Sequence, residues 1–117
     1  MFATHIYDAI LVRVIDADTV VMHVDTGFYQ WRHDMRLRLV GINAPEMNTE
    51  AGKAAKRYVD QWFASNPKIV IETIKDSSGL DKADSFGRYL AAVYARGNMT
   101  SLNSTLLAEG HAVPYRV

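Results

Sequence analysis

Residues 36–46, RLRLVGINAPE, decide how this chain folds. Their leucines and arginines alternate, so the leucines face one side of a strand and the arginines the other. Pro45 ends the strand, because proline lacks a backbone N–H and keeps the residue before it extended. The stretch therefore presents a guanidinium (Arg38), an amide (Asn43) and a carboxylate (Glu46). This trio suits chemistry on a phosphate, although for the stretch taken alone a surface strand followed by a turn is the favoured interpretation.

The composition indicates one folded domain over residues 1–117. Apolar residues make up 49% of the 117 positions, which argues against disorder and is enough for a buried core. The 13 Lys and Arg balance the 13 Asp and Glu, which argues against coating nucleic acid by bulk charge but not against a local basic site. The absence of cysteine excludes disulfides and thiolate metal sites.

The N-terminus lacks a basic region followed by a long apolar run. We therefore expect no signal peptide, and a cytoplasmic location is favoured. No apolar stretch is long enough to cross a membrane, so no membrane partner is expected. We expect a monomer.

Apolar and β-branched patterning predicts five strands, at residues 6–15, 20–24, 28–42, 68–74 and 88–95. Turns at 16–19 and 25–27 join the first three strands, the third being long enough to contain a bulge. Residues 75–87 are predicted to be a long polar loop, and 111–117 a short tail.

Helical periodicity predicts a helix over residues 49–65, with Thr49 as its N-cap and its apolar face beginning at Ala51. A short second helix is predicted over 101–109, with Gly110 as a left-handed cap. One helix between the third and fourth of five strands is the order of an OB barrel. The fold class predicted is therefore α+β, mainly β: a five-stranded OB-fold barrel with a helix between strands 3 and 4 and a short C-terminal helix.

Three separated motifs carry charged residues in a fixed order: residues 14–20 (VIDADTV), 38–46 (RLVGINAPE) and 84–88 (DSFGR). In this order and at about these distances they resemble the staphylococcal nuclease (thermonuclease) family. The resemblance runs from about residue 8 to 115 and includes that family's C-terminal helix. It implies a calcium-dependent nuclease, a phosphodiesterase built on an OB barrel.

The resemblance also implies a role for each matching residue. Arg38 and Arg88 are similar to the pair that holds the scissile phosphate, where two guanidinium groups oppose the charge that builds on its oxygens. Arginine is a poor general acid, so Arg88 is assigned to charge stabilisation. Glu46 resembles the residue that orients or deprotonates the attacking water, and both roles stay open.

Asp18, Asn43 and Ala44 match the family's calcium ligands, the last through its backbone carbonyl. Calcium accepts carboxylate, amide, carbonyl and water oxygens alike. Asn43 stands where the family usually has a second aspartate, so we expect Ca²⁺ to bind weakly without substrate. The four histidines share no ligand spacing, which argues against a histidine metal site.

Phe86 and Tyr115 are candidate substrate-binding residues. Each suits either stacking on a base of a single strand or packing in the core, and the sequence leaves both open. Ser85 and Phe86 stand where the family often has a lysine and a tyrosine that hold the nucleotide.

The leading hypothesis is a metal-dependent nuclease acting on DNA, RNA or both, with single strands favoured because their phosphates are accessible. The alternative is a catalytically weak or inactive member that binds nucleic acid or a protein partner. Retention of Arg38, Glu46 and Arg88 favours the enzyme, whereas Asn43 favours the alternative.

A more distant alternative is an unrelated OB module that binds oligonucleotides through the aromatic residues Phe28, Tyr29 and Trp31. It leaves the order of the three charged motifs unexplained.

Overall fold

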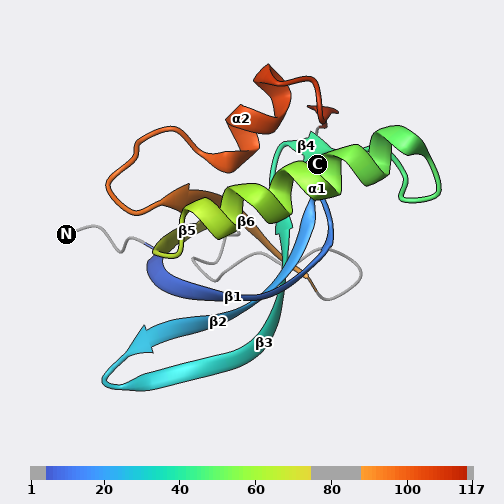
Figure 1. Ribbon diagram of the computed structural model, residues 1–117. Coiled ribbons are helices and arrows are strands. Elements are labelled where there is room, and N and C mark those ends of the chain that lie inside the picture. The colour runs from blue at the N-terminus through green and yellow to red at the C-terminus, as the bar shows by residue number, and fades with distance from the viewer. Residues whose placement is uncertain (1–4, 75–87, 116–117) are drawn as a thin grey trace.

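A computed structural model describes residues 5–74 and 88–115, so the loop predicted at 75–87 lies outside the described residues. Five strands close a barrel in the order β1-β2-β3-β6-β5, and two short strands form a separate small sheet (Figure 1). This is the mainly β, OB-type fold that the sequence predicts. The elements are β1 (Ile6–Asp16), β2 (Thr19–Gly27), β3 (Gln30–Leu39), β4 (Ile42–Asn43), α1 (Glu50–Ser65), β5 (Ile69–Thr73), β6 (Tyr89–Ala95), α2 (Leu102–Ala108) and β7 (Val113–Pro114).

The barrel closes through one parallel contact. Strands β1, β2 and β3 form an antiparallel meander, and β5 pairs antiparallel with both β1 and β6. Strand β3 then pairs in parallel with β6 at Leu37–Leu39 and Tyr89–Ala91. The two helices lie on the same side of the meander (Figure 1). Neither described helix has the length and apolarity needed to cross a membrane.

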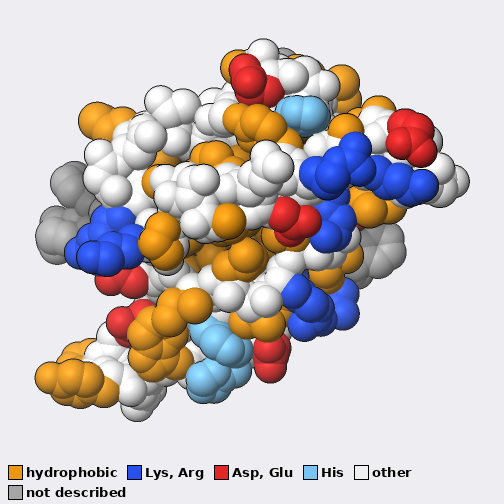
Figure 2. Space-filling model, viewed as in Figure 1, with side chains coloured by type: hydrophobic (Ala, Val, Ile, Leu, Met, Phe, Trp, Pro, Cys, Tyr) orange, Lys and Arg blue, Asp and Glu red, His pale blue; other side chains and the backbone are white. Residues whose placement is uncertain are grey.

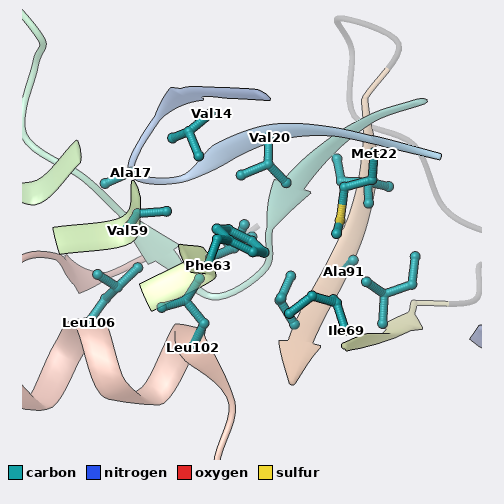
Figure 3. Close-up of a cluster of buried hydrophobic side chains, with 14 of the residues drawn as sticks. Val14, Ala17, Val20, Met22, Val59, Phe63, Ile69, Ala91, Leu102 and Leu106 are labelled. Atoms are coloured by element: carbon teal, nitrogen blue, oxygen red, sulfur yellow. The ribbon is translucent and has the colours of Figure 1, made fainter. Parts of the chain in front are cut away.

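One hydrophobic core joins the barrel to both helices. Figure 3 shows Val20 and Met22 of β2 pointing towards the same cluster as Phe63 of α1 and Leu102 of α2. The helix face is periodic as predicted, but Ala51 is exposed and the first buried position is Gly52. Thr49 is the N-cap of α1, as predicted, and its Oγ1 accepts the N–H of Gly52 at 3.0 Å.

The third predicted strand, residues 28–42, is wrong at both ends. Strand β2 continues through residues 25–27, which were predicted to be a turn, and the chain reverses at residues 28–29 instead. At the other end Gly41 adopts φ +82°, a left-handed conformation that turns the chain and ends β3 at Leu39. The chain resumes as β4, which pairs with β7 in the segment predicted to be a short tail.

The turn between β2 and β3 consists of Phe28 and Tyr29, because Gly27 pairs with Gln30. Both turn residues have positive φ, +55° and +62°. Two positive φ angles in a two-residue loop define a type I′ turn, which favours Asn-Gly and disfavours bulky side chains. The hairpin projects from the barrel (Figure 1), and His23 and His33 lie side by side on it, with Nδ1 atoms 3.3 Å apart.

Replacing this turn tests its strain. We expect the double variant Phe28→Asn with Tyr29→Gly to raise the melting temperature by roughly 5 °C, because Asn-Gly adopts the type I′ geometry without side-chain clash. Thermal unfolding followed by circular dichroism measures the change. A lower melting temperature would show that the aromatic side chains stabilise the hairpin.

Candidate functional site

A surface cavity of about 390 Å³ opens where the turn between β1 and β2 meets the chain that follows β3. It is lined by Asp16, Asp18, Arg38, Asn43, Ala44, Pro45, Glu46, Arg88 and Tyr115. The structure thus brings together every candidate site residue that it describes. The remaining candidate, Phe86, lies outside the described residues.

An ion pair between Asp18 and Arg38 forms the floor of the cavity. Arg38 Nη1 lies 3.0 Å from Asp18 Oδ2, with the side chains only 11% and 9% exposed. The backbone N–H of Ala44 donates to the same Oδ2 at 2.8 Å. One carboxylate therefore connects the β1–β2 turn, strand β3 and the segment after β4.

The guanidinium of Arg38 is held on its other side as well. Its Nη2 donates to the carbonyl of Ile42 at 3.0 Å and to Asn43 Oδ1 at 3.3 Å. The ring of Tyr115 lies beneath the guanidinium, with Cζ 5.4 Å from the ring centroid. Tyr115 is fixed there because its N–H donates to the carbonyl of Gly41 at 2.9 Å. Tyr115 therefore lies in the cavity and not in the core, and is 47% exposed.

Thr19 connects the second arginine to this pair and was missed by sequence reasoning. Its buried hydroxyl donates to Asp18 Oδ1 at 3.2 Å and accepts from Arg88 Nη1 at 3.3 Å. Arg88 directly precedes β6, so a side-chain bridge joins residues far apart in the chain. The available signal was a hydroxyl residue immediately after the Asp-x-Asp turn.

Two carboxyl groups share the β1–β2 turn. Burial and the neighbouring Asp18 raise the pKa of Asp16 to about 6. Burial also acts to raise the pKa of Asp18, but hydrogen bonds with Asp16 and the Ala44 N–H, together with the Arg38 guanidinium, outweigh it and hold that pKa below its ordinary value. As the pH rises, Asp18 therefore ionises before Asp16.

The oxygen atoms around the cavity suit a hard cation. Carboxylates of Asp16 and Asp18, the amide of Asn43 and the carbonyl-bearing residue Ala44 all line it. Within the described part of the chain no three His, Cys, Asp or Glu side chains cluster as a metal site. A metal here would need amide, backbone and water oxygens beside the carboxylates, which is a ligand set that calcium accepts.

Helix α1 determines the position of Glu46. The Glu46 carbonyl accepts the N–H of Thr49 at 3.0 Å and its hydroxyl at 2.6 Å. A Cβ on Gly52 would collide with that same carbonyl, so only glycine allows this approach of helix to loop. The Glu46 side chain itself is exposed at the cavity rim. Gly52 was also missed, although an isolated glycine in a helical pattern was the available signal.

Comparison with known proteins identifies related sequences. A family model described as staphylococcal nuclease homologue matches residues 36–117. The chain is 29% identical over 114 residues to a micrococcal nuclease of Shigella flexneri, covering 91% of this chain and 57% of that protein. It is also 29% identical over 113 residues to protein ParB of Escherichia coli, covering 91% and 56%, and 24% identical over 131 residues to an uncharacterised protein of Methanocaldococcus jannaschii, covering 95% and 60%. The chain thus spans under two thirds of the length of each relative.

Gly52→Ala tests the contact between α1 and Glu46. At an unconstrained helix position this change would stabilise by about 1 kcal/mol through helix propensity. Here we expect it to lower the free energy of unfolding by about 1–3 kcal/mol, because the added methyl group must push the helix off the Glu46 carbonyl. Urea denaturation measures it, with Ala51→Gly as the propensity control. A more stable variant would contradict the close approach.

Proposed function

The chain belongs to the staphylococcal nuclease family, and from this premise we propose that it is a metal-dependent nuclease that hydrolyses phosphodiester bonds in DNA, RNA or both. The observation that carries the proposal is a single cavity lined by two arginines and an exposed glutamate beside a buried aspartate. The relative from Shigella flexneri carries the name micrococcal nuclease, which supports the same reaction class.

In this proposal Arg38 and Arg88 hold the scissile phosphate. Asp18 and Thr19 keep their guanidinium groups in place before substrate arrives, so little reorganisation is needed when charge develops on the phosphate oxygens. A guanidinium carries five N–H donors, so Arg38 keeps donors for the phosphate after the contacts described above. Asp18 and Thr19 act as positioning residues for the arginines.

Glu46 is proposed to handle the attacking water. Its carboxylate is exposed at the rim of the cavity, while hydrogen bonds to its backbone fix where it stands. The water oxygen forms a new bond to phosphorus and the bond to one ester oxygen breaks. Glu46 orients the water or takes its proton, and the released oxygen acquires a proton from solvent.

We propose Ca²⁺ as the metal, held by Asp18, Asn43 and the carbonyl of Ala44, with Asp16 beside them. Bound there, it would polarise a phosphate oxygen and neutralise developing charge. The protein offers few formal negative charges, so affinity should be low until a substrate phosphate adds its own. Single strands are the preferred substrates in this proposal, because their phosphates and bases are accessible.

Glu46→Gln and Arg88→Ala test the chemistry. We expect each change to lower kcat/KM on single-stranded DNA by about 100-fold or more, because each removes a group that acts on the reacting atoms. Cleavage of a fluorescent oligonucleotide with calcium, and with chelator instead, is the measurement.

The matched control is Glu50→Gln, which removes the same charge from an exposed residue in the first turn of α1. Circular dichroism melts separate lost chemistry from lost folding. Equal turnover in wild type and Glu46→Gln would overturn the assignment. If the wild type binds DNA but does not cleave it, in calcium or in other divalent metals, the alternative is favoured: a catalytically inactive member of the family that binds nucleic acid.

Asn43→Asp tests the metal site. The change adds a negative charge at nearly constant shape beside Asp18, and ligand charge tunes calcium affinity. We expect calcium to bind about tenfold more tightly or better, as measured by calorimetric titration of the free protein. Asn48→Asp adds the same charge at an exposed position outside the cavity and serves as the control. Unchanged affinity would show that residue 43 does not contact the metal.

A further inference from the structure

Two arginines on β3 have no role in the site described above. Arg32 and Arg36 are both exposed. Among residues 5–74 and 88–115, neither has a carboxylate within ion-pair distance. The guanidinium of Arg32 lies over the ring of Tyr89, 5.7 Å from its centroid. The two cations are thus available to an anionic ligand.

Both arginines line a groove at the part of β3 that precedes the candidate site. A second cavity of about 250 Å³ is lined by Arg32, His33, Asp34, Met35, Arg36 and Tyr89. Leu37 pairs with Tyr89 in parallel, so the residues just before them, Arg36 and Arg88, lie level on neighbouring strands. Asp34 is the one acidic residue among those that line the groove. Arg36 therefore adds a third cation beside Arg38 and Arg88, and Arg32 lies further along the same groove.

The spacing of this row suits a polynucleotide. Arg36 and Arg38 are two residues apart on a strand, a separation of about 7 Å. This is close to the distance between successive phosphates of an extended single strand. Between Arg36 and Arg32 the pairing with β2 shifts by one residue and Asp34 has φ +54°, so β3 contains a bulge and Arg32 reaches the same cavity from the other face of the strand. Arginine is also the side chain suited to forked contacts with phosphate.

The far end of β3 carries the strained aromatic turn. Phe28 and Tyr29 are 93% and 103% exposed, so neither packs in the fold, and hydrophobic side chains cover the end of the projecting hairpin (Figure 2). Their left-handed conformations cost stability that no buried contact offsets. Strain retained at a fully exposed site points to binding, and aromatic rings stack on the bases of single strands.

We propose that β3 is a track for single-stranded nucleic acid, leading from the cavity past Arg36 and Arg32 to an aromatic platform formed by Phe28 and Tyr29. The proposal rests on the proposed function for its ligand. Phosphates contact the two arginines, and a base stacks on the turn. From Arg38 to Tyr29 the chain covers nine residues with a bulge among them, at most about 30 Å, so the track holds roughly four nucleotides.

Binding without metal tests the electrostatic part independently of catalysis. The probe is fluorescein-labelled oligodeoxythymidine of about twelve nucleotides, a length within the range of OB-fold sites, with anisotropy recorded in chelator over a salt series. Each lost phosphate contact lowers the slope of log K against log salt by about 0.7 on a single strand. We expect Arg32→Gln with Arg36→Gln to lower the slope by about 1.4 and to weaken binding at low salt by about tenfold.

The control is Lys53→Gln with Arg57→Gln, which removes two positive charges from exposed positions on α1. An equal loss of slope in the control and in the β3 variant would overturn the track, as would an unchanged slope in the β3 variant. An unchanged slope in the β3 variant would also favour a protein partner for this surface.

Cleavage by substrate length separates this proposal from the proposed function. We expect the β3 double variant to lower the ratio of kcat/KM for the long oligonucleotide to that for a thymidine dinucleotide by about tenfold. Phe28→Asn with Tyr29→Gly should lower the same ratio while raising the melting temperature, which no loss of folding can produce. An unchanged ratio in both variants refutes the track, whereas a wild type that cleaves neither substrate refutes the proposed function.

Discussion

The buried ion pair between Asp18 and Arg38 is the interaction on which the rest of the site depends. Two charges with little exposed surface lose most of their hydration, so they are stable only when other hydrogen bonds complete them. The Ala44 N–H and the Thr19 hydroxyl donate hydrogen bonds to the carboxylate. The Ile42 carbonyl and the Asn43 amide oxygen accept hydrogen bonds from the guanidinium. Removing one partner of such a pair typically costs about 3–5 kcal/mol, so the pair constrains all the segments that meet there.

This dependence joins stability to the proposed chemistry. Asp18 Oδ2 already accepts two hydrogen bonds, and the same carboxylate is the one proposed to bind calcium. A cation in the cavity would therefore compete with Arg38 for negative charge, and a phosphate would supply charge to both. Metal and substrate are expected to favour each other's binding for this reason. The amide of Asn43 makes metal binding depend more strongly on the substrate phosphate, because it adds no negative charge of its own.

The sheet topology determines which cations lie at the candidate site. The parallel contact of β3 with β6 sets Arg36 and Arg88 side by side, and the antiparallel contact with β2 sets Arg38 beside Thr19. A net charge of zero is compatible with the proposed nucleic-acid binding because a single strand, β3, carries Arg32, Arg36 and Arg38. The local field around β3 matters for such binding, more than the total charge.

Local physics determined much of this protein directly from its sequence. Alternation predicted the barrel strands, helical periodicity and the Thr49 cap predicted α1, and Gly110 with φ +75° ends α2 as predicted. The order of three charged motifs was enough to select the candidate site residues. The strands, the helix and its caps depend on neighbours a few residues apart, so a linear pattern contains them.

Only the tertiary structure decided the contacts between distant segments. Strand β7 pairs with β4 and brings Tyr115 beneath Arg38, Thr19 joins Arg88 to Asp18, and Gly52 lets α1 touch the Glu46 carbonyl. The bend at Gly41 also belongs here, because its left-handed φ serves the pairing of β4 with a segment far along the chain. Such contacts depend on how the closed barrel arranges its strands in space, and no periodicity in the sequence records that arrangement.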